Sequence, residues 1–164
     1  MSIQIKRLME SISKRTVTFL KEEMNIEVNT QDIKLVKESR LELNHLTSVI
    51  TVGTAPHIFV IFSYEKELID KIFEAYTQEI DVLPEEKTEY IEETAGDMLN
   101  IVVGNVISEF DTNGKAINLS TPIVITDAQS IAKSRTVKFF INNLGTSYGN
   151  MSIFCVGPNE LFEM

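Results

Sequence analysis

Apolar residues recur every three or four positions in three stretches of this chain, which is the period of an amphipathic helix. The spacing predicts helices over residues 3–24, 66–76 and 88–110. Asn25 follows the first helix as a terminator, and Thr88 is expected to cap the third. The residues that mark the buried sides are Ile5, Leu8, Met9, Ile12, Val17 and Leu20 in the first helix, Leu68, Ile69, Ile72 and Phe73 in the second, and Ile91, Ala95, Met98, Leu99, Val102, Val106 and Phe110 in the third.

Shorter apolar stretches bounded by turn residues predict strands. The run at 57–62 lacks alternation, which places it centrally in a sheet with both faces covered. Pro122 is expected at a strand end or bulge, because proline cannot donate to the ladder. The other expected strands are residues 26–36 (broken), 46–52, 116–119, 123–125, and a final pair, 136–141 and 150–156, joined by a loop over 142–149. The sequence therefore predicts an α+β fold. We expect a single domain over residues 1–164, with a mainly antiparallel sheet packed by a long N-terminal helix and a long central helix.

Composition narrows the class of protein. The 164 residues are 43% hydrophobic, with a mean hydropathy of +0.02, and the longest apolar runs are too short to cross a bilayer. No basic segment followed by an apolar stretch opens the chain, so we expect a cytoplasmic protein. A formal charge of −9 disfavours nucleic acid and anionic membranes as partners. A protein partner with a basic docking face fits this charge better.

Several common chemistries have no motif in the sequence. Cys155 is the only cysteine, lies in an apolar run, and is expected to be a small buried side chain with no disulfide. His45 and His57 lack the spacing of a zinc site. The chain contains neither a Walker loop nor a dinucleotide-binding glycine fingerprint, which argues against a nucleotide enzyme.

Candidate chemistry lies on the polar side of the helix expected over 88–110. Glu93, Asp97, Asn100 and Gly104 fall within about 60° of one another around its axis. A carboxamide can hold a water without taking its proton, and a carboxylate one turn away can pair with a cation of a docked partner. Glycine inside a helix costs about 1 kcal/mol, which close approach by that partner would offset. The pattern of an acid, two residues and Asn also fits an ordinary solvated helix face.

The wider pattern resembles the CheC/CheX family, whose members are phosphatases of the phosphorylated chemotaxis receiver CheY. An amphipathic helix carries acid-x-x-Asn-x-x-x-Gly-Asn, and a proline follows about twenty residues later. The family pattern of Asp or Ser, then Glu, Asn and Pro falls here on Glu93, Asp97, Asn100 and Pro122. Only one convincing copy of the motif helix is present, which favours the single-site CheX type over the two-site CheC type.

The resemblance implies a function and a role for each residue. The chain is expected to hydrolyse the aspartyl phosphate of a CheY-like receiver in chemotaxis or another two-component pathway. Asn100 would place the attacking water and Asp97 would pair with a receiver lysine. Gly104 would permit close approach, and Glu93 would add negative charge. Magnesium would belong to the receiver, so the chain would need no cofactor of its own, and a homodimer would form through sheet edges.

Three departures from the family pattern leave alternatives open. Asp97 is one methylene shorter than the family Glu, Glu93 stands where Asp or Ser is usual, and the interval to Pro122 is one residue short. One alternative is a non-catalytic module of the same fold that sequesters a receiver or another signalling protein. Another is an unrelated metabolic enzyme, which predicts a deep pocket lined by polar groups.

Overall fold

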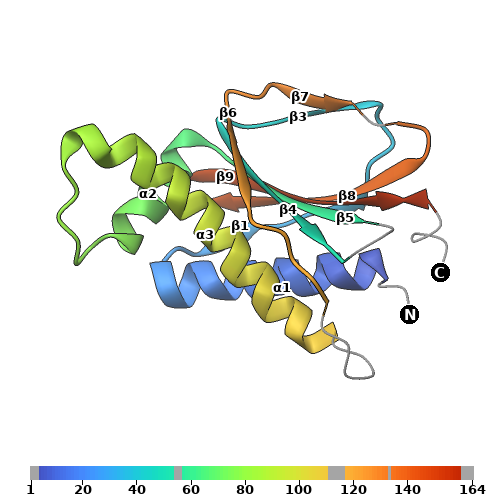
Figure 1. The fold of residues 1–164 in the computed structure, drawn as a ribbon, viewed down its shortest axis with the longest axis horizontal. Coiled ribbons are helices and arrows are strands. Elements are labelled where there is room, and N and C mark those ends of the chain that lie inside the picture. The colour runs from blue at the N-terminus through green and yellow to red at the C-terminus, as the bar shows by residue number, and fades with distance from the viewer. Residues whose placement is uncertain (1–3, 54–56, 111–116, 133, 160–164) are drawn as a thin grey trace.

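Three helices cover one face of an antiparallel sheet in this computed structural model, which describes residues 4–53, 57–110, 117–132 and 134–159 (Figure 1). The α-helices are α1 (Ile5–Met24), α2 (Lys66–Tyr76) and α3 (Lys87–Ile107). Two short 3-10 turns flank α3, η1 (Pro84–Glu86) before it and η2 (Ser108–Phe110) after it. None of the helices in the described ranges is both long and apolar enough to span a membrane.

The main sheet has seven strands, and all of its pairings are antiparallel. Its order is β1-β8-β9-β5-β4-β6, and β2 also pairs with β8. A separate two-stranded sheet joins β3 to β7. The strand bounds are β1 (Val28–Thr30), β2 (Ile33–Leu35), β3 (Arg40–Glu42), β4 (Leu46–Val52), β5 (Ile58–Tyr64), β6 (Ile123–Thr126), β7 (Ser130–Ala132), β8 (Val137–Thr146) and β9 (Gly149–Pro158).

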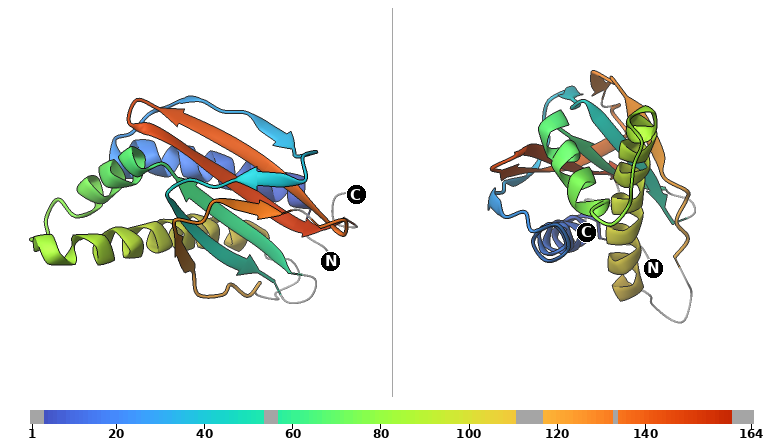
Figure 2. Two further views of the ribbon diagram at one scale, coloured as in Figure 1. Left: turned by 90° about the horizontal axis from the view of Figure 1, so that it is seen from above. Right: turned by 90° about the vertical axis from the view of Figure 1, so that its left-hand side faces the viewer.

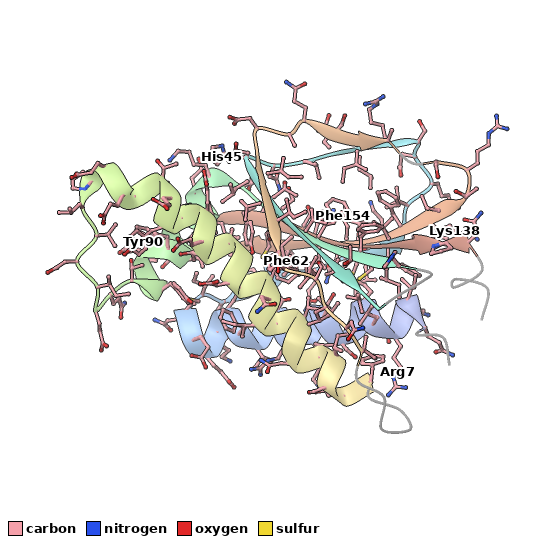
Figure 3. The ribbon with its side chains drawn as sticks, viewed as in Figure 1. Arg7, His45, Phe62, Tyr90, Lys138 and Phe154 are labelled. Carbon is pink, nitrogen blue, oxygen red and sulfur yellow. The ribbon has the colours of Figure 1, made fainter. Side chains whose placement is uncertain are left out.

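The alternation of side chains along the strands produces two apolar clusters, one on each face of the main sheet. The larger cluster lies between the sheet and the three helices and includes Phe62. The smaller one lies on the opposite face, includes Phe154, and is covered by Leu41 of β3 and Ile131 of β7. Figure 3 labels Phe62 and Phe154, and Figure 2 shows the β3–β7 pair and the helices on opposite sides of the sheet.

The periodicity analysis is confirmed for the helices and the central strands. α2 and β4 have the predicted bounds, and α1 ends at Met24, where Asn25 caps it with a left-handed backbone (φ 55°). β5 lies between β9 and β4 in the middle of the sheet, as its unbroken apolar run indicates. Pro122 immediately precedes β6, at a strand end. The α+β prediction is therefore correct.

Some local predictions are wrong. The loop expected over 142–149 is mostly strand, because β8 continues to Thr146 and the turn occupies only residues 147–148. Thr88 is not the cap of α3, since the helix starts at Lys87 directly after η1. The strand expected over 116–119 reduces, within the described residues 117–119, to one bridge between Leu119 and Val52. Turn residues at 53–56 and 111–114 also predict turns, but apart from Gly53 these positions lie outside the described residues. The strands β3 and β7 were not predicted.

Candidate functional site on the exposed face of α3

α3 is held firmly against the sheet beneath the candidate site. Its buried residues include Ala95, Met98, Leu99 and Val102, which contact β4, β5 and β6 through the larger cluster. Tyr64 of β5 is fully buried and donates a hydrogen bond of 3.2 Å from its hydroxyl to the carbonyl oxygen of Ala95. Burial strongly raises the pKa of Tyr64, so this phenol stays protonated and remains a donor.

The opposite side of α3 carries the predicted polar patch. Glu93, Asp97 and Asn100 are exposed, and Gly104 is half-buried beside them. Ile101, 37% exposed, adds an apolar side chain next to Asn100. All four predicted residues are thus at least partly accessible on α3, while their grouping as a functional site and their roles remain predictions.

Asp97 has one hydrogen-bond partner among the described residues. The hydroxyl of Tyr76, the last residue of α2, donates to Oδ2 of Asp97 across 3.1 Å. The partial burial of Tyr76 and the negative charge and hydrogen bond of Asp97 raise the pKa of this phenol. Sequence reasoning missed Tyr76, because 21 residues separate it from Asp97 and only the packing of α2 on α3 brings them together.

Asn100 presents an unengaged carboxamide. Within the described ranges its side chain makes no hydrogen bond, and the same holds for the carboxylate of Glu93. A free carboxamide at an exposed position can donate to one group and accept from another, as positioning a water requires.

Pro122 lies close to the motif although it is distant in sequence. A Cβ built on Gly96 would come within 3.6 Å of Cβ of Pro122 and 3.5 Å of Cγ2 of Val124. Gly96 is adjacent to Asp97, so the residue before β6 packs next to the polar patch. The tertiary structure thus brings Pro122 against α3 beside Asp97, two positions of the family pattern that are 25 residues apart in sequence.

The charge of α3 is unbalanced toward acid. Lys87 is its only basic residue, against Glu89, Glu92, Glu93 and Asp97. None of the ion pairs formed by the described residues involves Asp97 or Glu93. The patch therefore offers carboxylates that a cationic group on another molecule can neutralise.

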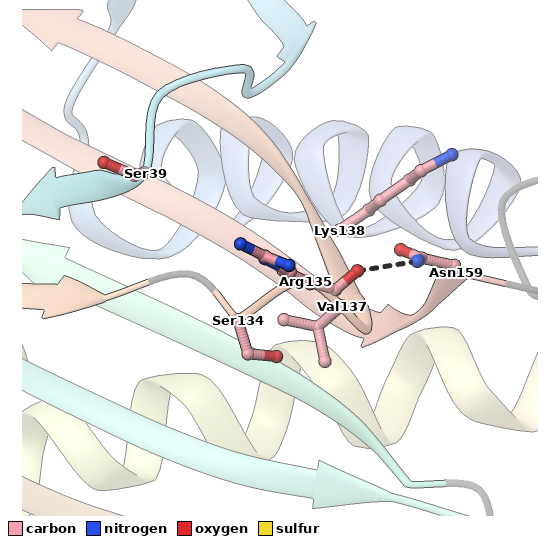
Figure 4. A pocket seen from close by; sticks show the side chains of 6 residues that line it. All are labelled: Ser39, Ser134, Arg135, Val137, Lys138 and Asn159. Carbon is pink, nitrogen blue, oxygen red and sulfur yellow. Dashed lines mark hydrogen bonds between the residues drawn. The ribbon is translucent and has the colours of Figure 1, made fainter.

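Other parts of the described structure carry weaker candidates for a functional site. An open hollow of about 350 Å³ lies where β8 begins and β9 ends, lined by Ser39, Ser134, Arg135, Val137, Lys138 and Asn159 (Figure 4). No residue of α2 or α3 lines this hollow, so it is separate from the polar patch.

Cys155 is buried, as predicted, and burial raises the pKa of its thiol. The described His, Cys, Asp and Glu side chains form no group of three or more suited to a metal ion.

The whole architecture matches solved structures of chemotaxis proteins. CheX of Desulfovibrio desulfuricans has 12% identity and a TM-score of 0.74, with 91% of this chain and 97% of that chain covered. A CheC-like superfamily protein of Shewanella sp. PV-4 has 20% identity and a TM-score of 0.74, with 91% and 96% covered. The CheX–CheY–BeF3–Mg2+ complex of Borrelia burgdorferi matches with 13% identity and a TM-score of 0.70, over 96% and 98% of the two chains.

Sequence comparison assigns the family. No curated protein matches the chain in sequence. The family model described as chemotaxis phosphatase CheX matches residues 46–142, which is more than half of the chain and includes the motif helix and Pro122. The chain therefore belongs to the CheX family of chemotaxis phosphatases.

Proposed function

We propose that this protein is a phosphatase that docks on a phosphorylated CheY-like receiver and hydrolyses its aspartyl phosphate. The observation that carries the proposal is the exposed pair of Asp97 and Asn100, one turn apart on a helix whose opposite side is buried against the sheet. The CheX–CheY complex of Borrelia burgdorferi, which shares the fold, supports a receiver as the partner.

Asn100 acts on the attacking water in this proposal. Its carboxamide accepts a hydrogen bond from the water or donates one to it. This hydrogen bond holds the water oxygen in line with the phosphorus. The new bond joins water oxygen to phosphorus, and the bond from phosphorus to the receiver carboxylate breaks. The products are dihydrogen phosphate, which retains both protons of the water, and the free carboxylate of the receiver. Positioning accounts for most of this catalysis, so no nucleophile of this chain is required.

Asp97 binds the receiver by charge. Its carboxylate has no cationic partner within the described structure and can pair with a lysine at the receiver's reaction centre. Glu93 adds to the negative potential, and the absent side chain of Gly104 allows the receiver backbone to approach. The magnesium ion belongs to the receiver in this scheme. In this scheme the protein and the receiver meet in the cytoplasm, in chemotaxis or another two-component pathway.

We also propose that the protein is a homodimer joined through sheet edges. β6 is an edge strand, and Ile123, 64% exposed, and Ile125, 40% exposed, lie on it. A strand edge with uncovered isoleucines is a surface that pairing with a second copy would bury.

Phosphate release from a continuously rephosphorylated receiver tests the catalytic proposal. A CheY-like receiver is charged with acetyl phosphate and Mg2+, and release is measured with wild type, Asn100→Ala and Asp97→Ala. Asn100→Ala should reduce kcat by about 100-fold or more, because the water loses its orientation. Asp97→Ala should raise KM, and Asp97→Glu should retain activity or increase it.

Asn105→Ala is the matched control. Asn105 is also exposed on α3, but five residues further on it is turned by about 140° from Asn100, so its loss should leave the rate unchanged. Equal release by wild type, Asn100→Ala and Asp97→Ala would remove the enzymatic proposal. Receiver binding that persists without phosphate release would identify the chain as a sequestering module. The main support for this alternative is the shorter side chain of Asp97.

A further inference from the structure

The hydrogen bond between α2 and α3 engages one of the two carboxylate oxygens at the candidate site. Tyr76 donates to Oδ2 of Asp97 across 3.1 Å, and no other described residue bonds to that carboxylate. Oδ1 is left unengaged on an exposed side chain. The carboxylate is thus held at one oxygen and open at the other.

Tyr76 is itself fixed by the packing of α2. Ile72 and Phe73 are buried one turn earlier. Thr77 caps the helix, and its hydroxyl donates to the carbonyl oxygen of Phe73 across 2.7 Å. The ring of Tyr76 is 38% exposed, so it stands beside Asp97 at the surface and is not sealed beneath it. A phenol on a rigid helix end restricts the rotation of the aspartate that it contacts.

We propose that Tyr76 is a positioning residue that orients Asp97 so that its free oxygen faces the cationic group of a docked receiver. This inference rests on the proposed function and adds a residue from a second helix to the site. An aspartate reaches less far than a glutamate, so the direction of its carboxylate decides whether a partner cation can contact it. A hydrogen bond to an ionised oxygen is the stronger kind and suits this role.

The pairing has a spectroscopic test that does not depend on activity. Tyrosine labelled with 13C at Cζ reports the titration of each phenol by NMR. Partial burial raises the pKa of Tyr76, and the negative charge and hydrogen bond of Asp97 raise it further, so Asp97→Asn should lower that pKa. An unchanged Tyr76 titration in Asp97→Asn would overturn the proposal.

The functional consequence is tested by phosphate release at varied receiver concentration. Tyr76→Phe removes only the hydroxyl and should raise KM about 3- to 10-fold while kcat changes less than about twofold. In the Asp97→Ala background, Tyr76→Phe should have no further effect, because the carboxylate that it orients is gone.

Tyr148→Phe is the control for loss of a phenol hydroxyl. Tyr148 is 42% exposed at the β8–β9 turn, and among the described residues its ring contacts Lys71 while its hydroxyl makes no hydrogen bond. This variant should match wild type in KM. A KM effect of Tyr76→Phe that persists without the Asp97 carboxylate would show a general structural role and reject the positioning role. A wild-type protein that releases no phosphate, yet shows the Tyr76 shift, would reject the proposed function and establish the pairing.

Discussion

Two glycines of α3 differ in what surrounds them, although both lie inside the same helix. Gly96 is buried under Pro122 and Val124. Gly104 is half-buried, and among the described residues a Cβ there would meet only Cδ1 of Leu119, at 4.0 Å. Both sites would accept a methyl group at ordinary contact distance. Packing against the described residues therefore does not explain the glycine at 104, which agrees with a role in contact with another molecule.

Alanine at these two positions separates stability from docking. Gly96→Ala and Gly104→Ala should each stabilise the fold by up to about 1 kcal/mol, because alanine loses less backbone entropy in a helix. The midpoint of thermal unfolding should rise by about 2–4 °C in both variants. Only Gly104→Ala should lower kcat/KM for receiver dephosphorylation, by about tenfold, since its methyl group occupies the docking surface. Full activity of Gly104→Ala would show that no partner approaches this residue closely.

At the scale of elements, α3 is a platform whose position the sheet decides. Its apolar side is buried on β4, β5 and β6, and the Tyr64 hydroxyl ties β5 to Ala95, between Glu93 and Asp97 in the helix. A polar contact inside an apolar layer restricts the rotation and sliding of the helix on the sheet. The orientation of the exposed patch therefore depends on this buried bond as well as on hydrophobic packing.

Tyr64→Phe tests the anchoring of α3. Loss of the buried hydrogen bond should destabilise the fold by about 1 kcal/mol and lower the unfolding midpoint by about 2–4 °C. Because the phenyl ring keeps its packing, the fold should be retained. Calorimetry of Tyr64→Phe beside Tyr148→Phe gives the comparison, since the exposed Tyr148 hydroxyl makes no such bond. Equal midpoints for the two variants would contradict the anchoring role.

The length of the β8–β9 hairpin is also an element-scale result. Asn142, Asn143 and Gly145 are typical turn residues, which is why the sequence indicates a loop. In the structure Asn142 is buried, and its Oδ1 accepts from the backbone amide of Asp32 across 3.0 Å. Because the carboxamide of Asn142 has a hydrogen-bond partner, this asparagine is compatible with a strand. Local sequence does not reveal this, since Asp32 lies 110 residues away.

At the scale of the whole molecule, the sheet is covered unevenly. The helices cover one face, and the β3–β7 pair covers part of the other (Figure 1). The edge at β6 leaves Ile123 and Ile125 exposed, so the surface proposed for assembly with a second copy belongs to a complete strand of the sheet.

Charge placed on β6 should dissociate the proposed homodimer. Ile125→Lys puts a cation on the edge strand and should convert a dimer in sedimentation velocity into a monomer of unchanged fold. Glu109→Lys on η2 is the control, because it changes charge at an exposed site away from β6 and should leave the dimer intact. A wild-type protein that sediments as a monomer at all accessible concentrations would contradict the dimer itself.

The sequence by itself determined the helices, the central strands and the side of α3 that faces outward. These features follow from side-chain periods of 3.6 residues in helices and 2 in strands. The spacing of apolar residues shows these periods, and the buried residues follow them. The sequence also showed the family pattern on Glu93, Asp97, Asn100 and Pro122, because the first three of these residues lie in one helix at fixed spacing.

The tertiary structure alone decided which distant segments meet. It pairs β3 with β7, extends β8 through Asn142, brings Pro122 against Gly96, and places Tyr76 of α2 on Asp97 of α3. No local period encodes these contacts, because each depends on how whole elements pack on a shared sheet. Local sequence thus determines the helix that carries the candidate chemistry. Tertiary packing determines which distant residues contact that helix.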